Sequence, residues 1–382
     1  MSLLMAMPLR YLTLPLLALL SCAHAALLSR QQVDGMLAPL GSDNHFDSSK
    51  TVDWGVLPGP FYTPELGLGI GTAVVGMYRP DSLDSVSQNS TLALKGFFSS
   101  TGAFGVGFEN YSFFANDQWR FFASGSLNNM PTYFWGTGYQ AGRHDGNKEK
   151  YTQQSFQIAP QLLYRIANAT YAGAGWDFSS THASDPDRGD SSLFKAQAAG
   201  TSSISSGISG SLSYDTRDFV SNASRGQFLS LSDTYFAPEL GGDSRFNTLE
   251  GQYNAYYSLS EKSVLALDVY SRLTTGDVPW DRLSELGDDK RMRGYYQGRY
   301  RDRNTFSGQV EYRRKLNWRH GYVLWAGAGT LNRKTGDLGQ GPWLPTVGVG
   351  YRFEFKPRMN VRLDFGVGRE SSGFYFQVGE AF

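Results

Sequence analysis

The stretch RMNVRLDFGVGRESSGFYFQVGEAF, residues 358–382, decides the fold, because apolar and polar residues alternate strictly along its first half. One face holds Val361, Leu363, Phe365 and Val367, and the other holds Asn360, Arg362, Asp364, Gly366 and Gly368. A period of two residues is typical of a β-strand with one apolar face. A soluble sandwich and a membrane barrel both produce such strands, so the number of repeats and the turn lengths must separate the two.

The same period recurs along the chain from Trp54 onward, in about sixteen segments. They begin near residues 53, 66, 90, 102, 118, 152, 169, 206, 225, 246, 262, 304, 319, 343, 358 and 372. This spacing leaves about 20 residues for each strand and its connection, which suits an outer-membrane barrel.

The connections between these segments fall into two length classes. Those after even-numbered strands are mostly tight, near residues 116, 168, 260, 317 and 357, whereas residues 129–151, 180–204, 275–303 and 330–342 form long connections after odd-numbered strands. Outer-membrane barrels have short periplasmic turns and long extracellular loops. We therefore predict an all-β fold: one sixteen-stranded antiparallel transmembrane β-barrel over residues 51–382, with extracellular long loops and periplasmic short turns.

Composition and charge agree with this class. The chain has 44 Gly, 22 Tyr, 25 Phe and 8 Trp, and beyond its start no apolar run is long enough for a membrane helix. The 35 basic and 35 acidic residues leave no net positive charge that would attract nucleic acid. We expect no nucleic-acid partner.

The first 25 residues have the pattern of a signal peptide. An apolar run precedes Ala23 and Ala25, whose A-x-A spacing is typical of a cleavage site. We expect a signal peptide (1–25), a periplasmic segment (26–50) and the barrel (51–382), located in the outer membrane. Cys22, the one cysteine of the chain, also fits a lipoprotein box, which is an alternative processing site.

The segment RMRGYYQGRYRDRN, residues 291–304, puts five arginines into the longest loop. Inward positions of nearby strands carry acids, so this loop can fold back into the lumen and pair with them. We predict that Arg293 anchors the loop, with Glu311, Glu354 and Asp364 as candidate partners, and that Arg299, Arg301 and Arg303 line or cap the pore. The alternative is an external loop that binds anionic lipopolysaccharide.

The sequence resembles the bacterial surface antigen family, which includes the BamA and TamA assembly barrels and two-partner-secretion transporters. Four stretches carry the resemblance: MRGY (292–295), YDTRDFVSNASRGQF (214–228), PTYFWGTGY (131–139) and FYFQVGEAF (374–382). The resemblance implies a lumenal loop motif at Arg293, Gly294 and Tyr295. It also implies a periplasmic turn motif at Asp215, Thr216, Arg217, Asp218 and Gly226. The pattern departs from the family at Ala223, where a proline is usual, and at Gly327, where an acid is common.

The family resemblance also implies roles for the last strand. Phe374, Phe376, Val378 and Phe382 fit the signal read by the barrel-assembly machinery, while Glu380 departs from it. In such barrels the last strand closes against the first. Residues 26–50 are too few for a POTRA domain, so we expect a member without POTRA domains, acting as a pore or in a specialised role in outer-membrane biogenesis or transport.

Two other function classes remain as alternatives. An outer-membrane enzyme of the lipase type would need a nucleophile, a base and an orienting group, and the five histidines have no partner at a recognisable spacing. A surface adhesin is suggested by the Arg-Gly-Asp tripeptide at 188–190, which more often belongs to a solvated loop. We expect a monomer that is not an enzyme, with no catalytic residues, cofactor or metal. Its expected partners are outer-membrane lipid and lipopolysaccharide, and the assembly machinery during biogenesis.

Overall fold

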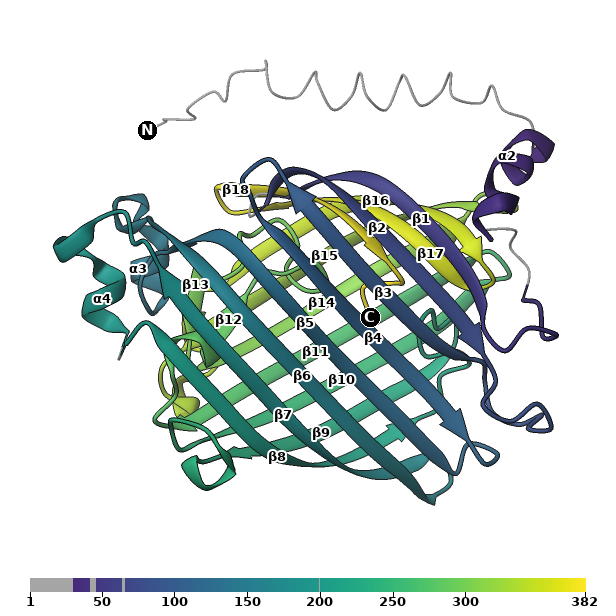
Figure 1. Ribbon diagram of the computed structural model, residues 1–382, viewed down its shortest axis with the longest axis horizontal. Helices are drawn as coiled ribbons and strands as arrows, with labels where there is room; N and C mark the ends of the chain where they lie inside the picture. Colours follow the sequence, from purple (N-terminus) through teal and green to yellow (C-terminus); the bar gives the residue numbers. More distant parts are fainter. Residues whose placement is uncertain (1–29, 42–45, 64–65, 199) are drawn as a thin grey trace, which may run out of the picture.

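The computed structural model describes residues 30–41, 46–63, 66–198 and 200–382, and within them sixteen strands form one antiparallel sheet that curls into a barrel (Figure 1). The strands are β1 (Asp53–Thr63), β2 (Gly67–Tyr78), β3 (Ser90–Ser99), β4 (Phe104–Phe114), β5 (Trp119–Phe134), β6 (Glu149–Ala167), β7 (Thr170–Ser184), β8 (Ser202–Asp215), β9 (Gly226–Phe236), β10 (Phe246–Ser260), β11 (Ser263–Gly276), β14 (Asn304–Lys315), β15 (His320–Asn332), β16 (Leu344–Lys356), β17 (Met359–Gly368) and β18 (Ser371–Val378). The sixteen-stranded barrel predicted from the sequence is confirmed, and the strand starts agree within a few residues.

The remaining described elements are short and lie between or before the barrel strands. They are α2 (Arg30–Leu37), α3 (Tyr139–Arg143), α4 (Leu193–Gln197), the small strands β12 (Ser284–Leu286) and β13 (Tyr300–Asp302), and 3₁₀ turns at Ala38–Leu40, Asp145–Asn147, Gly189–Ser191, Pro238–Leu240, Trp280–Arg282 and Thr335–Asp337. Among the described residues, no helix has both the length and the apolarity needed to cross a bilayer.

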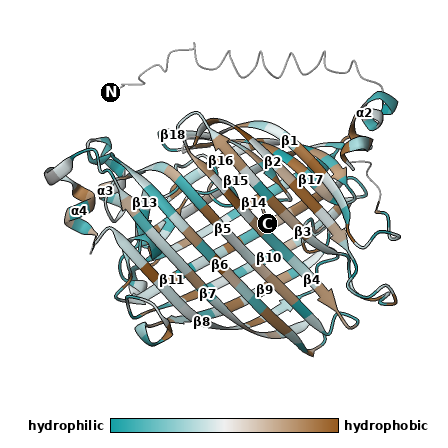
Figure 2. Cartoon of the chain, in the orientation of Figure 1, coloured by the Kyte–Doolittle hydropathy of each residue, from teal (hydrophilic) through white to brown (hydrophobic). Residues whose placement is uncertain are grey.

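Alternation along the strands produces two different faces. Figure 2 shows apolar and polar residues interleaved along the barrel strands. Leu231 and Val347 point outward and leave 53% and 54% of their surface exposed. Large apolar side chains at this exposure would be costly in water, whereas a lipid environment covers them without cost. The opposite, inward face of several strands carries the buried charged residues described below.

The connections separate the barrel into two ends. At the long-loop end the long connections are residues 135–148, 185–201, 277–303 and 333–343, and the same end also has the shorter connections 64–66, 100–103, 237–245 and 369–370. At the short-turn end they include 115–118, 168–169, 261–262, 316–319 and 357–358, although 79–89 and 216–225 at this end are longer. The predicted long connections therefore all lie at one end, and the connections at the other end are mostly short, with two exceptions.

The barrel has a seam between its first and last strands. In the described residues no backbone ladder joins β1 to β18, so the predicted closure of the last strand against the first is wrong as a hydrogen-bonded pairing. Side chains fill the seam instead. A Cβ atom added to Gly59 of β1 would lie 2.9 Å from the Phe376 ring of β18. Phe376 has the outward register of Leu363, yet it meets the lumenal side of Gly59, so β18 overlaps β1 from inside.

The short-turn end of the seam is held by an ion pair. Nζ of Lys356, at the end of β16, lies 2.8 Å from Oδ2 of Asp53 at the start of β1, and both side chains are buried. The helix α2, which precedes β1 in the chain, contacts the same end: Arg319 of the β14–β15 turn donates to Oδ1 of Asp34 at 2.8 Å. The part of segment 26–50 that the structure describes thus contacts the short-turn end. The predicted signal peptide (1–25), including Cys22, lies outside the described residues.

Candidate functional site in the barrel lumen

The connection between β11 and β14 folds into the lumen. Within it β12 and β13 pair as a small antiparallel ladder, with Ser284 opposite Asp302. At its tip Arg293 and Tyr295 are fully buried, which an external loop would not permit. We call residues 277–303 the lumenal loop.

Arg293 contacts inward-facing acids from two different strands. Its Nη1 donates to Oδ2 of Asp364 on β17 at 2.5 Å, and its Nη2 donates to Oε1 of Glu311 on β14. The indole of Trp325 on β15 lies under the guanidinium, with Cζ 3.8 Å from the ring centroid. A planar guanidinium can bind two carboxylates and stack on an aromatic ring at the same time. Removing one member of such a buried set leaves an uncompensated charge, so the contacts fix the loop firmly.

Gly294 and Tyr295 complete the contact of the loop tip with β17. Gly294 has a φ of +110°, and a Cβ atom there would lie 2.7 Å from the nitrogen of Val367. The Tyr295 ring covers Gly368, while its hydroxyl donates to the carbonyl of Pro345 at 2.6 Å. Only glycine fits between the two backbones, because any side chain would clash and the φ value is unfavourable for it.

The third candidate partner, Glu354, does not contact Arg293. Its carboxylate accepts from Lys315 at 3.2 Å near the short-turn end, so its assignment as a partner was wrong. The reason is its position along the barrel axis. Glu354 lies near the end of β16, at the short-turn end, whereas Asp364 pairs with Gly350 nearer the middle of that strand. Inward direction alone did not distinguish the two heights.

Other cations of the lumenal loop bind acids around the rest of the wall. Arg291 donates to Asp268 of β11 at 2.8 Å. Arg282 donates to Asp177 of β7 at 2.6 Å, and Lys290 lies 3.6 Å from Glu109 of β4. The pKa of Lys290 is raised, chiefly by the charge of Glu109 and against the effect of burial. The loop is therefore fixed on opposite sides of the lumen.

The remaining loop arginines contact the long-loop end. Arg299 donates to Oδ1 of Asp145 at 2.9 Å, and Arg301 lies 3.3 Å from Glu285 within the loop. Arg303 donates its backbone N–H to Asp302 at 2.8 Å. Arg299 therefore attaches the lumenal loop to the β5–β6 connection, and Arg301 joins two parts of the loop to each other.

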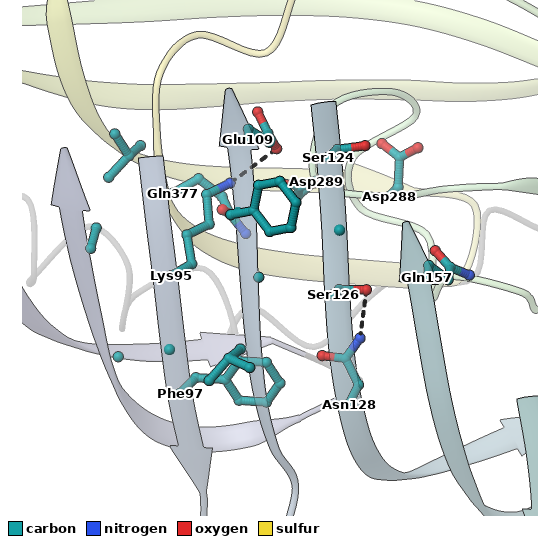
Figure 3. A pocket seen from close by; sticks show the side chains of 18 of the residues that line it. Lys95, Phe97, Glu109, Ser124, Ser126, Asn128, Gln157, Asp288, Asp289 and Gln377 are labelled. Atoms are coloured by element: carbon teal, nitrogen blue, oxygen red, sulfur yellow. Dashed lines mark hydrogen bonds and ion pairs between the residues drawn. The ribbon is translucent and has the colours of Figure 1, made fainter. Parts of the chain in front are cut away.

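A cavity of about 690 Å³ remains between the lumenal loop and the wall formed by β3–β6. Figure 3 shows Lys95 and Glu109 pointing toward each other. Nζ of Lys95 lies 3.4 Å from Oε1 of Glu109, and Asp288 of the loop and Ser124 of β5 both line the cavity. Phe376 and Gln377 of β18 also line this cavity. The space left free by the loop therefore extends from the β3–β6 wall to the seam.

The predicted turn motif lies between β8 and β9. Asp215 accepts from Arg217 and from Arg120 of β5, at 2.8 Å and 2.7 Å. The hydroxyl of Thr216 accepts the backbone N–H of Gln227 at 2.9 Å. These contacts close the turn around the end of β8.

Asp218 and Gly226 fix the second half of this turn. Asp218 accepts from the hydroxyl of Ser224 at 2.6 Å and from Arg358 at 2.9 Å. Gly226 has a φ of +101°, and a Cβ atom there would lie 2.2 Å from the carbonyl oxygen of Thr216. Ala223, where the family usually has a proline, is buried against Tyr256.

After β18 the C-terminal residues contact inward-facing residues of the barrel wall. Phe374 pairs with Phe365 of β17 and Val378 with Val361, so both keep the outward register. Phe382 instead packs against the cluster of Ala223, Tyr256 and Ala266, and Arg313 donates to its carbonyl at 2.9 Å.

Glu380, which departs from the terminal pattern, accepts from Arg352 at 2.8 Å and from Asn360 at 2.6 Å. Its charge therefore has a structural partner on the inward face.

Sequence reasoning missed several members of this network. Arg352 and Arg362 both donate to Asp364, at 2.5 Å and 2.8 Å, and Arg313 donates to Glu311 at 3.0 Å. All three arginines share the inward parity of the acids. The alternation had already put Arg362 on the polar face with Asp364, and the same rule could have placed Arg352 and Arg313 in the lumen. Across the described part of the chain, no cluster of three or more His, Cys, Asp or Glu side chains could hold a metal ion.

These observations define the class of protein: an integral outer-membrane β-barrel whose lumen holds its longest loop. A family model for the Omp85 superfamily domain matches residues 90–382. The chain belongs to the Omp85 superfamily, and it resides in the bacterial outer membrane as the barrels of this family do. The sequence-based resemblance to BamA-type barrels is thereby confirmed.

Solved structures of similar fold include the BamA barrel from Haemophilus ducreyi lacking POTRA domains 1–3. It has a TM-score of 0.51 and 12% identity, and the match covers 85% of this chain and 69% of that chain. CdiB from Acinetobacter baumannii matches with a TM-score of 0.56 and 12% identity, covering 87% of this chain and 60% of CdiB.

CdiB from Escherichia coli also has a TM-score of 0.56, with 11% identity over 86% of this chain and 62% of that CdiB. This chain thus spans less than two thirds of the length of either CdiB. A comparison with curated protein sequences found no match.

Proposed function

We propose that this protein is a plugged barrel with a specialised role in outer-membrane biogenesis or transport, in which the lumenal loop restricts the pore. The observation that carries the proposal is the buried contact of Arg293 with Glu311 and Asp364. A loop held by charges from several strands cannot leave the lumen without exposing unpaired ions. The resting barrel is therefore a poor conductor rather than an open porin.

The orientation proposed here puts the long-loop end outside the cell and the short-turn end in the periplasm. This follows the usual arrangement of outer-membrane barrels. The apolar outer face contacts membrane lipid, and the charged long loops contact lipopolysaccharide. Phe374, Phe376, Val378 and Phe382 provide the signal for the barrel-assembly machinery, and the folded protein acts as a monomer.

A role in biogenesis or transport is favoured by the seam. In the described residues β1 and β18 form no backbone ladder with each other, so the wall is weakest at the seam, and the lumenal cavity extends to the seam. BamA and CdiB barrels have the same fold, but at this identity the likeness supports fold and not activity. The proposal of an Omp85-type role therefore depends on family membership together with the seam.

An enzyme activity of the lipase type is the second candidate, because one observation favours it. Nδ1 of His182 on β7 lies 2.8 Å from Oγ of Ser202 on β8, and both side chains are exposed. A serine and a base at this distance are two parts of a hydrolytic site. In the described residues, no carboxylate is bonded to His182, so the orienting group of a triad is not in place. We propose that the protein is not an enzyme.

An adhesin role has less support. Arg188 of the Arg-Gly-Asp tripeptide donates to the carbonyls of Gly146 and Lys148, at 2.5 Å and 3.0 Å. Its guanidinium is thus engaged with the neighbouring loop.

Two measurements together test the proposed function. Planar-bilayer recording of the purified protein should give small or rare conductance steps, and an assembly assay on a deletion strain should show a defect in selected outer-membrane proteins. Large, stable porin-like steps with normal outer-membrane assembly would contradict it. For the lipase candidate, Ser202→Ala should abolish ester hydrolysis by the purified protein if that activity exists.

A further inference from the structure

Two prolines lie two residues apart in the middle of the first barrel strand. Pro58 and Pro60 flank Gly59 in the sequence LPGPF of β1, which is one of the two edges at the seam. Proline has no backbone N–H, so it cannot donate to a neighbouring strand. Because residues two apart direct their N–H and C=O groups to the same edge, both prolines remove donors from one side of β1.

The pairing of β1 with β2 identifies that side. The register runs without interruption from Asp53 opposite Met77 to Thr63 opposite Gly67, through both prolines. If the proline nitrogens faced β2, two ladder bonds would be missing in the centre of a membrane strand, where water cannot replace them.

Other prolines of the barrel support this assignment. Pro160 of β6 lies between β5 and β7: it pairs with Ala123 of β5, while the β6–β7 register is interrupted between Ile158 and Gln161. Pro131 and Pro345 lie just beyond the ends of the ladders with β4 and β17, so their nitrogens face no partner strand. In this barrel a proline that faces a paired strand breaks the ladder, and the ladder of β1 with β2 is intact.

The seam edge of β1 is therefore without donors from Leu57 to Phe61. The donors on either side, at Val56 and Tyr62, are six residues apart, about 20 Å along a strand and a large part of the roughly 30 Å hydrocarbon layer. The Phe376 ring lies against Gly59, between the two prolines. An aromatic side chain of β18 thus covers the lumenal face of β1 at this position, without forming a backbone ladder.

We infer that Pro58 and Pro60 keep the seam from closing by backbone pairing, so that β1 cannot act as a hydrogen-bonding template for β18 or for a strand of another chain. Edge strands are commonly protected from unwanted pairing by proline. The seam is then held by side chains, namely Phe376 on Gly59 and Lys356 on Asp53. Another protein that contacts the seam from the membrane cannot add a β-strand to β1 between Leu57 and Phe61. This inference concerns the fold of the seam and does not depend on the proposed function.

The test restores the donors. The double variant Pro58→Val and Pro60→Val, folded in detergent or lipid, should pair β1 with β18. Backbone hydrogen exchange of residues 373–377 should then slow by roughly tenfold or more, because new ladder bonds must open before exchange. A new dimer on a native gel would also support the inference, since it indicates pairing with a second copy.

The control is Pro131→Val in β5, which adds a donor where no strand faces it and should leave exchange in β18 unchanged. Heat-modifiable migration establishes that each variant is folded. If the double variant fails to fold, the single variants Pro58→Val and Pro60→Val each restore one donor and should each slow exchange partially. Unchanged exchange in β18 together with a monomeric state, in any folded variant, would overturn the inference.

Discussion

The guanidinium of Arg293 lies 2.5 Å from the carboxylate of Asp364, and both side chains are completely buried in the lumen. Asp364 also accepts from Arg352 and Arg362, so one carboxylate joins the lumenal loop to two wall arginines. Arg352 in turn binds Glu380 beyond β18. The loop tip and the C-terminal residues are therefore connected through one buried network of charges.

Replacing Arg293 should loosen the lumenal loop. Arg293→Ala leaves Glu311 and Asp364 with fewer cations, which we expect to cost about 3 kcal/mol of unfolding free energy. Single-channel conductance in planar bilayers should rise, as should protease cleavage within residues 277–303.

Two controls separate this effect from general damage. Arg188→Ala, in another long loop, should leave conductance unchanged. Arg293→Lys keeps the charge but cannot bind two carboxylates with a planar fork, so it should give an intermediate conductance. If Arg293→Ala has wild-type conductance and an impermeant reagent labels residue 295 on whole cells, the loop is not a lumenal anchor.

The ion pair between Lys356 and Asp53 should stabilise the seam. Lys356→Met removes the cation closest to Asp53. Among the described residues, Lys50 at 3.5 Å and the backbone N–H of Asp47 at 3.1 Å then remain as its partners. We expect a loss of about 2 kcal/mol, because a buried carboxylate is left poorly paired. The measurement is the temperature at which the folded band disappears on a semi-native gel.

The matched control is Lys315→Met, whose ion pair with Glu354 is half exposed and should contribute little. Equal melting temperatures for the two variants would show that the Lys356–Asp53 ion pair stabilises the barrel no more than the exposed pair does.

Phe382 should have two roles: it belongs to the signal for the assembly machinery, and it stabilises the folded barrel by packing. Phe382→Ala is expected to slow insertion in cells, and it should also reduce unfolding free energy by about 2 kcal/mol through lost packing on Ala223 and Tyr256. Comparing insertion in cells with spontaneous refolding in detergent separates the two effects.

Glu380→Gln serves as the comparison, because it keeps the aromatic pattern of the last strand. It should leave insertion unchanged and destabilise only the folded barrel, because Arg352 loses its carboxylate partner. A normal insertion rate for Phe382→Ala would contradict its role in the assembly signal.

The turn between β8 and β9 should make stability depend on pH in acid. Burial alone would raise the pKa of Asp218, but hydrogen bonds from Arg358 and Ser224 lower it from 3.8 to about 2. Because the folded pKa lies below the unfolded one, the ionised turn adds stability above about pH 4 that is lost as the pH falls through about 2. Unfolding midpoints measured from pH 5 to 1.5 should fall less steeply for Asp218→Asn than for the wild type. Parallel curves would refute this assignment.

Much of the fold could be predicted from the sequence because strand alternation is a local property. Val361 and Asp364 reveal opposite faces of one strand whatever lies beside them, and sixteen repeats of this pattern give the strand count. The same parity placed Glu311 and Asp364 in the lumen. It also placed Glu354 there, although at a height where Arg293 does not reach.

The sequence by itself determined the alternating strands, the two classes of connection and the presence of an arginine-rich loop with acids on the inward faces. Only the tertiary structure decided which charges meet. Arg293 and Asp364 are 71 residues apart, and Lys356 and Asp53 are 303 apart, so their contact depends on strand order, stagger and the curvature of the sheet. The seam was decided in the same way: Pro58 and Pro60 are visible in the sequence, but the direction of their nitrogens follows from the register of β1 with β2. Alternation fixes the face of a residue within its own strand, whereas pairing across the lumen requires the positions of all strands at once.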